Sequence, residues 1–418
     1  MSVSSGPMNF GQLSVWRDVE EFPAEKAYQA NMVRVVPLDG VATATVRAVV
    51  ERLRARHAAL RTVYDFADPA APRQHVRPAD SAGLVFREVG PRDGEDAEAA
   101  AARIADEMEH ESFDLTTDES LRTAIVVVDG EGTHGVFALH HIAADMWSLD
   151  LLRGEVDALL RGDEPAGDAP SPLDLALAQH SERWAPRREA AARHLREAFT
   201  AAAQAAVPGI ALAEAATARA NLRSRVAGPT AEAKAAALGI SVPSLVLAAY
   251  CREAHRISGA EHVLINTMTT NRLHPGTATL VSSLNQWARV ISHRGADDFT
   301  AMAASLHWSS MRSFRYGCYD VDTEARIRAE VEAGTGPIHP EFHFNFVDSP
   351  APADPPDADD ELSETKVSAL PATYVGGPGF YLVATSGGDF HLTARTRWAG
   401  FTDADMAAFL RAVHENLI

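Results

Sequence analysis

The chain has 418 residues, more than one hydrophobic core usually organises, so two domains are expected. Hydrophobic residues make up 46% and charged residues 23%, as in ordinary soluble globular proteins. With 57 acidic and 38 basic residues the net charge is −19, which argues against nucleic acid or an anionic membrane surface as the main partner.

Cysteine usage and the N-terminal sequence favour a cytoplasmic protein. Cys251 and Cys318 are far apart and lack metal-ligand spacing, which fits a reducing compartment rather than a disulfide scaffold. The opening "MSVSSGPMNFGQLSVW" has no basic start and no long apolar segment, so no secretory signal is expected. No run approaches the roughly 18 apolar residues that a membrane span requires.

In the first part of the chain, helical and strand patterns alternate. Residues 41–60 predict an amphipathic helix, because their valines and leucines recur on one helical face. Residues 121–129 and 134–141 predict two strands joined by a tight turn that contains Asp-Gly. A second helix is expected at residues 148–162, so the segment between strand and helix is a short loop.

A boundary between two lobes is expected where Pro, Gly and Asp accumulate, at residues 161–172. The expected lobes are residues 1–165 and 172–418, both of mixed α/β character. An acidic, Pro-rich stretch at 350–364 predicts a mobile loop. Further helices are expected within 176–184, 188–206, 230–239, 241–259 and 402–417, and strands within 262–272, 284–295, 341–349 and 389–398.

The loop after the second strand carries the polar group of greatest interest, His140, His141 and Asp145. A single histidine at a strand end is more often a packed residue than a catalyst. Adjacent strand residues point to opposite faces, so one histidine can support the core while the other faces a cavity. Asp145 could fix the loop or touch a substrate. Metal binding is a third interpretation, disfavoured because no fourth ligand is recognisable and strand alternation separates the two imidazoles.

The chemical interpretation of this group is acyl transfer. Moving an acyl group from a thioester to an amine or alcohol requires a base beside the attacking nucleophile, and a neutral imidazole suits that role at physiological pH. A carboxylate paired with arginine can hold the loop in shape. A backbone N–H or histidine itself could stabilise the oxyanion.

These residues resemble the His-His-x3-Asp-Gly signature of the nonribosomal peptide synthetase condensation-domain superfamily, which is related to chloramphenicol acetyltransferase. The resemblance extends along almost the whole chain and keeps the family's motif order. It rests on "NFGQLSVWR" (9–17), "RHAALRTVY" (56–64), "FDLTTDESLR" (113–122), "LHHIAADMWS" (139–148), "INTMTTNR" (265–272), "LVSSLNQWARV" (280–290) and "FHFNFVD" (342–348).

The resemblance implies an α/β fold of two chloramphenicol-acetyltransferase-like lobes arranged as a V with a central tunnel. It also implies that donor and acceptor arrive as phosphopantetheine thioesters on carrier proteins, with no cofactor or metal bound permanently. His141 would be the catalytic or positioning base, and His140 would pack structurally. Asp145 would form an ion pair, with Arg272 the first choice of partner and Arg61 the second; Arg61 could equally be a surface charge at a helix end.

The sequence departs from the family pattern at two places. Met146 stands where the signature has Gly, so it is expected to narrow the tunnel or alter the loop. Asn285 lies one residue closer to its Arg than the usual pattern places it. Together with Trp147 and Ser148, these two residues are the expected tunnel lining. The chain also begins and ends with the domain, so a free-standing member that recruits its substrates in trans is expected.

Three functions remain open. The leading hypothesis is a stand-alone condensation enzyme that joins a carrier-bound acyl or aminoacyl thioester to an amine or hydroxyl. The second is a polyketide-associated-type acyltransferase that acylates a free alcohol. The third is a non-catalytic recruitment module, because fold alone does not settle function. An acidic carrier protein would need a basic patch, for which residues 183–196 and 311–317 are candidates; for the first, a solvated helix face balanced by glutamates is favoured.

Overall fold

The computed structural model describes residues 4–204, 210–294, 298–338, 341–348, 365–372, 377–387 and 389–418. Its contacts divide the chain into two compact units, the first comprising Met1–Arg188 and Thr270–Gln286, the second Glu189–Thr269 and Trp287–Ile418. This division differs from the lobes expected at 1–165 and 172–418. Helix α5 (Pro172–His180) packs on strand β1 (Ser4–Pro7), which keeps the chain in the first unit beyond the Pro-rich segment. The acidic stretch at 350–364 lies outside the described residues.

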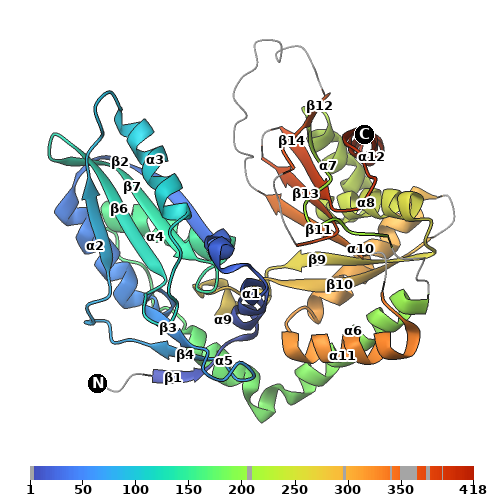
Figure 1. Ribbon diagram of the computed structural model, residues 1–418, viewed down its shortest axis with the longest axis horizontal. Helices are drawn as coiled ribbons and strands as arrows, with labels where there is room; N and C mark the ends of the chain where they lie inside the picture. The colour runs from blue at the N-terminus through green and yellow to red at the C-terminus, as the bar shows by residue number, and fades with distance from the viewer. Residues whose placement is uncertain are drawn as a thin grey trace. The chain divides into compact units, whose positions relative to one another are not determined.

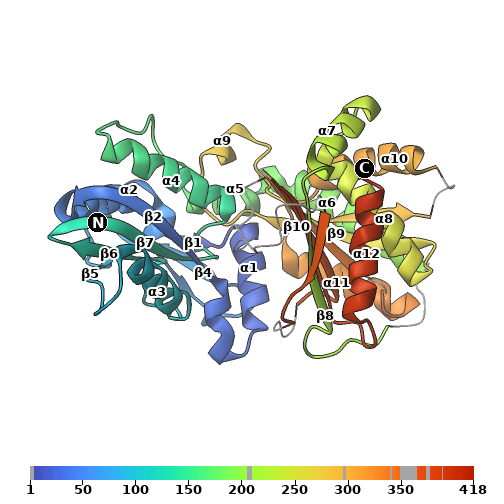
Figure 2. The same ribbon diagram turned by 90° about the horizontal axis from the view of Figure 1, so that it is seen from above.

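A four-stranded sheet forms the centre of the first unit, in the order β2 (Asn31–Ala42), β7 (Glu131–His140), β6 (Leu121–Val128), β5 (Val85–Val89). Helices α2 (Thr43–Arg56) and α4 (Met146–Leu160) cover one face, and α3 (Ala97–Glu109) covers the other (Figures 1 and 2). Both faces of β7 are therefore buried, which explains its continuous apolar run.

The helix expected at 41–60 is shorter than the pattern suggested. Val41 pairs with Gly132, so β2 continues to Ala42 before α2 begins. At the other end His57 is extended, and its Nε2 lies 2.7 Å from the Glu155 carboxylate on α4. His57 is buried in this contact while Glu155 is partly exposed, and residues 58–61 form a separate 3₁₀ turn.

The first unit is completed by a small sheet, β1–β4–β3, with β4 at Arg73–Val76 and β3 at Thr62–Asp65. Helix α1 (Phe10–Glu20) begins with a capping box between Asn9 and Gln12. A Cβ on Gly11 would lie 2.3 Å from the Ser283 carbonyl oxygen, so only glycine lets α1 approach residues 270–286 this closely. Short helices η1 (Ala24–Ala30), η2 (Ala58–Arg61), η3 (Glu182–Trp184) and α9 (Pro275–Ala278) fill the connections.

The second unit is built on a seven-stranded mixed sheet whose buried face is lined by phenylalanine and leucine. Helices α7, α8, α10 and α12 cover that face, while α6 and α11 pack on the other face near β9 and β10. The strand order is β10 (Gln286–His293), β9 (His262–Thr269), β11 (Glu341–Asp348), β13 (Phe380–Ser386), β14 (Phe390–Thr396), β8 (Ala218–Ser224), β12 (Thr365–Ala369). The helices are α6 (Ala185–Gln204), α7 (Ala227–Leu238), α8 (Val242–Ser258), α10 (Phe299–Arg315), α11 (Val321–Thr335) and α12 (Asp403–Glu415).

Within the described residues, no single helix has the length and apolar composition needed to cross a membrane. The consecutive pair α7 and α8, bent by 98°, meets the length and composition test only when its two helices are taken together.

Candidate functional site

The two adjacent histidines point to opposite faces of the first unit's sheet. His140 ends β7 on the face covered by α3, where it is 3% exposed and meets the edge of the Phe113 ring at 6.0 Å between centroids. Its Nδ1 accepts the Ile142 backbone N–H at 3.1 Å. Burial, followed by the nearby His141 and Arg122 charges, lowers the pKa of His140 to about 3. The ring is therefore neutral near pH 7 and acts as a structural acceptor.

His141 directly follows the last residue of β7, and its backbone N–H bonds to the Ala30 carbonyl at 2.8 Å. Its side chain is half-buried, and its Nδ1 lies 2.9 Å from the Ala144 carbonyl oxygen. A carbonyl can only accept, so Nδ1 carries the proton and Nε2 carries the lone pair. The loop thus fixes both the ring and its tautomer.

Asp145 is the N-cap of α4 and is almost completely buried, at 3% exposure. Its Oδ1 accepts the backbone N–H of Ser148 at 2.9 Å and the Ser148 hydroxyl at 2.8 Å. Its Oδ2 accepts the backbone N–H of Leu284 at 3.1 Å. Both carboxylate oxygens are occupied by partners in the protein, so Asp145 holds the loop and α4 together.

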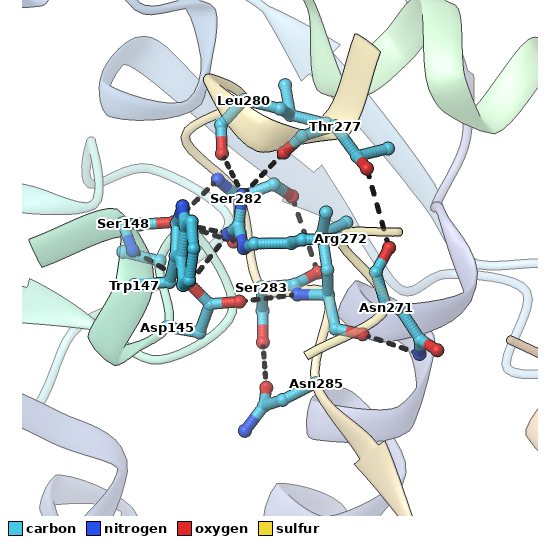
Figure 3. A network of polar contacts seen from close by, with 12 residues as sticks. Asp145, Trp147, Ser148, Asn271, Arg272, Thr277, Leu280, Ser282, Ser283 and Asn285 are labelled. Carbon is cyan, nitrogen blue, oxygen red and sulfur yellow. Dashed lines mark hydrogen bonds and ion pairs between the residues drawn. The ribbon is translucent and has the colours of Figure 1, made fainter. Parts of the chain in front are cut away.

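Arg272 pairs with this carboxylate through Nη2, 2.7 Å from Asp145 Oδ1, and both side chains are almost inaccessible (Figure 3). The same nitrogen reaches the Ser148 hydroxyl at 2.9 Å, and Nη1 donates to the carbonyl oxygens of Thr277 and Leu280 at 2.8 and 2.7 Å. Burial lowers the pKa of Arg272, and the Asp145 charge opposes that shift. Arg272 therefore ties the His-His loop to residues 277–282.

Arg61, the second candidate partner, lies elsewhere in the first unit. Its guanidinium donates to the backbone carbonyl of Arg77, and burial lowers its pKa. It therefore braces the end of the small sheet, whereas Asp145 is paired with Arg272.

The residues expected to line a tunnel have different surroundings. Ser148 is fully buried inside the ion-pair network, because its hydroxyl donates to the Asp145 carboxylate and accepts from Arg272. Trp147 is 45% exposed, and its indole N–H donates to the Ala278 carbonyl at 2.9 Å. Asn285 is half-buried and accepts the Ser283 hydroxyl at 3.0 Å (Figure 3).

Met146, which replaces the signature glycine, starts α4 without a positive φ angle. Its side chain is 44% exposed, and its Sδ lies 3.1 Å from Arg34 Nη2. The substitution therefore leaves the backbone of the loop unstrained and adds apolar bulk beside β2.

Several groups in the network escaped sequence reasoning. The Ala144 carbonyl that orients His141 and the Leu284 N–H that binds Asp145 are backbone atoms, which no residue pattern marks. Ser282 accepts a hydrogen bond from Asn9 at its hydroxyl and donates its backbone N–H to the Ser148 hydroxyl. In the sequence, Ser282 is marked as a candidate by its position in the motif "LVSSLNQWARV".

The described residues contain no group of three or more His, Cys, Asp or Glu that could hold a metal ion. Three of the basic residues proposed for carrier docking have hydrogen-bond or ion-pair partners within their own unit. Arg188 donates to the carbonyl oxygens of Gln179 and Ser181, while Arg196 pairs with Glu330 and Arg312 with Glu197.

Comparison with known proteins identifies the family of this chain. The condensation-domain family model matches residues 12–376. Phosphinothricin tripeptide synthetase PhsC of Streptomyces viridochromogenes is 32% identical over 175 residues, 41% of this chain and 16% of that protein. The chain thus spans about a sixth of that relative's length.

Solved structures share the fold over the whole chain. The condensation domain that mediates chain release from the enacyloxin polyketide synthase superposes with a TM-score of 0.72 at 22% identity, covering 100% of this chain and 83% of that one. The X-domain solved in complex with OxyB from teicoplanin biosynthesis gives a TM-score of 0.69 at 17% identity, covering 100% and 93%.

The family's amide- or ester-forming chemistry uses carrier-bound substrates and needs no permanently bound cofactor, and the His-His-x3-Asp segment lies inside the matched range. The chain belongs to the condensation-domain family.

Proposed function

We propose that this protein transfers an acyl or aminoacyl group from a carrier-protein thioester to an amine or hydroxyl acceptor, with His141 as the base. The observation that carries the proposal is the fixed tautomer of His141. Its Nδ1 is bound to the Ala144 carbonyl, and the described residues form no hydrogen bond to its Nε2. A base so oriented can meet an acceptor without first breaking an internal contact.

In the proposed reaction, the acceptor's nitrogen or oxygen attacks the thioester carbonyl while its proton moves to His141 Nε2. The new C–N or C–O bond forms, the C–S bond breaks, and the proton passes to the departing phosphopantetheine sulfur. Asp145 and Arg272 take no part in proton transfer, because their polar atoms are occupied by each other and by backbone groups. Their role is to position the loop.

The acceptor class and the recruitment of carriers in trans are parts of this proposal. Acylation of a free alcohol, as in a polyketide-associated-type acyltransferase, uses the same base and differs only in the acceptor. A recruitment module is the alternative of another class, and the likeness to the X-domain structure shows that one fold serves several proteins. An oriented His141 favours catalysis over recruitment.

The test offers acyl-loaded carrier proteins with candidate amines and alcohols, and follows acyl loss by intact-protein mass spectrometry. His141→Ala is expected to lower kcat/KM by about 10²–10⁴-fold, the usual contribution of a general base. His134→Ala is the matched control, because His134 lies on the same strand and, among the described residues, its ring hydrogen-bonds to Thr133 Oγ alone, at 3.3 Å. It should retain activity.

Product mass separates amide from ester. Transfer that persists at the wild-type rate in His141→Ala would remove the proposed base. Carrier binding without transfer by the wild-type protein would favour the recruitment module.

A further inference from the structure

The buried ion pair between Asp145 and Arg272 lies close to the protein surface. Its two side chains are only 4% and 2% exposed. Met146, directly after Asp145, is nevertheless 44% exposed, and Leu273, directly after Arg272, is 75% exposed. Because solvent reaches the chain neighbours of both partners, the pair depends on a covering side chain to stay dry.

Trp147 provides this cover. It is the second residue of α4, and its indole ring lies over the Arg272 guanidinium, with 5.8 Å between the ring centroid and Cζ (Figure 3). The indole N–H donates to the Ala278 carbonyl at 2.9 Å, which holds the ring in this position. Trp147 is 45% exposed, so one side of the ring meets solvent while the other faces the guanidinium.

The guanidinium has one polar group that hydrogen bonds leave unsatisfied. The Nε atom of Arg272 is buried and has no hydrogen-bond partner among the described residues, whereas Nη1 and Nη2 donate to the Leu280 carbonyl and the Asp145 carboxylate. The face of an indole ring is electron-rich and attracts a cation, more strongly where water is excluded. Trp147 therefore gives the guanidinium an attractive surface in place of water.

The ion pair reaches His141 through a single peptide group. The Ala144 carbonyl accepts the His141 Nδ1–H at 2.9 Å, and Ala144 directly precedes Asp145. The Asp145 carboxylate is fixed by Arg272 and by the Leu284 N–H. Water that enters the pair would compete for the carboxylate and release the peptide between Ala144 and Asp145. The His141 ring would then lose the acceptor that selects its tautomer.

We propose that Trp147 is a positioning residue that keeps the Asp145–Arg272 pair dry and thereby holds His141 in its reactive orientation. The inference rests on the proposed role of His141 as the base, and it gives Trp147 a task other than lining a substrate path. The two tasks differ in kinetics. Loss of a lining residue raises KM, whereas loss of a positioning residue lowers kcat and leaves KM unchanged.

The first experiment measures hydrogen exchange of residues 141–160 at about 0.05 M and about 1 M NaCl, because salt screens a solvated ion pair far more than a dry one. Wild type should respond little. Trp147→Ala should lose a further roughly two- to fivefold in protection at high salt, the usual worth of a solvated pair. Trp147→Phe keeps the ring face and should lie closer to wild type. Trp308→Ala, the same change at a residue 70% exposed in the second unit, is the matched control and should behave like wild type.

The second experiment reads the His141 ring directly. Nitrogen NMR of histidine-labelled protein distinguishes the two neutral tautomers, and the His141→Gln spectrum assigns the signals. Wild type and Trp308→Ala should show His141 with the proton on Nδ1. Trp147→Ala should show a mixture of both tautomers.

The third experiment measures transfer from acetyl-pantetheine, a small donor that needs no carrier docking, to a panel of amines and alcohols. Trp147→Ala should lower kcat about tenfold at unchanged KM, through loss of the ring face and one hydrogen bond, and Trp147→Phe should recover most of the rate. In an Asp145→Asn background, Trp147→Ala should have little further effect, because the pair that it protects is already broken.

Three results would overturn the inference. These are an equal loss of protection at both salt concentrations, a rise in KM with kcat unchanged, and a full additional effect of Trp147→Ala in the Asp145→Asn background. An unmixed His141 tautomer in Trp147→Ala would equally sever the proposed link to the base. Absence of transfer by wild type would count against the proposed function alone, because hydrogen exchange and NMR still decide the role of Trp147.

Discussion

The buried pair between Asp145 and Arg272 gives the sharpest prediction about how the site is held together. Asp145→Asn removes the charge but keeps the size of the side chain. If the amide oxygen keeps the Oδ1 contacts, the amide N–H₂ faces the Leu284 N–H, two donors that cannot bond. The unpaired N–H alone costs about 1–3 kcal/mol.

The larger effect comes from the charge left behind. Arg272 would remain buried, with its side chain 2% exposed, and without a counter-ion. Removing one partner of such a pair typically destabilises a protein by about 3–5 kcal/mol, a total that includes the lost hydrogen bond. We therefore expect Asp145→Asn to lower the free energy of opening of the 141–160 segment by that amount.

The assay is native-state hydrogen exchange read by mass spectrometry, because a chain with two units need not unfold in one step. Asp150→Asn is the matched control: the same helix and the same chemical change, but an exposed side chain, with an expected effect within about 0.5 kcal/mol. Arg272→Met in the Asp145→Asn background should cost less than the sum of the single changes. A loss below about 1 kcal/mol for Asp145→Asn, or strict additivity, would refute the argument that the pair organises the loop.

Two further predictions concern stability. The pKa of His140 is about 3 in the folded protein and about 6.5 in the unfolded chain, so between these pH values the unfolded chain binds one more proton. The contribution of His140 to the free energy of unfolding is therefore present above pH 6.5 and is lost as the pH falls toward 3. Between pH 7 and pH 5 this loss of unfolding free energy is about 2 kcal/mol. In His140→Gln the unfolding free energy, measured with denaturant, should therefore fall by about 2 kcal/mol less over that pH range, and the same pH dependence as in wild type would contradict the prediction. Gly11→Ala should destabilise by about 1–3 kcal/mol in the same assay, because its Cβ would meet the Ser283 carbonyl at 2.3 Å. Gly154→Ala, in an exposed turn of α4 with no atom within 4 Å of its Cβ, should instead stabilise by about 0.5–1 kcal/mol, and similar effects at both positions would argue against the contact.

Sequence patterns predicted the local structure around the site well, because strand alternation is a short-range property. The run that ends at His140 and His141 gives β7, and alternation alone assigns the two rings to opposite faces. The helix after Asp145 follows from its apolar spacing, although it begins at Met146 rather than at residue 148. Helix α4 begins two residues earlier than its apolar spacing predicts, because the Asp145 side chain caps its N-terminus.

Local sequence patterns do not predict which residues far apart in the chain contact each other. Arg272 is 127 residues from Asp145 in sequence, and the resemblance to a family, rather than any spacing, put it ahead of Arg61. The division by contacts differs from the expected boundary for the same reason, since residues 270–286 join the first unit through contacts that composition does not encode. Strands such as β8 and β13 have a weak apolar pattern, because alternate positions are half-buried and carry polar side chains.

The two histidines acquire different chemistry from one structural difference, the face on which each ring lies. On the α3 face, His140 has burial, an aromatic edge and the Arg122 charge, and these leave it neutral and without a free lone pair. On the α4 face, His141 is only half-buried, and its Nδ1–H donates to the Ala144 carbonyl in the loop that Asp145 and Arg272 hold. Exchanging the roles would require a one-residue shift of β7, which would also move Leu139 off the face that packs against α2 and α4 and put Ala138 in its place. The strand register thus couples the orientation of the proposed base to the packing of the first unit's core.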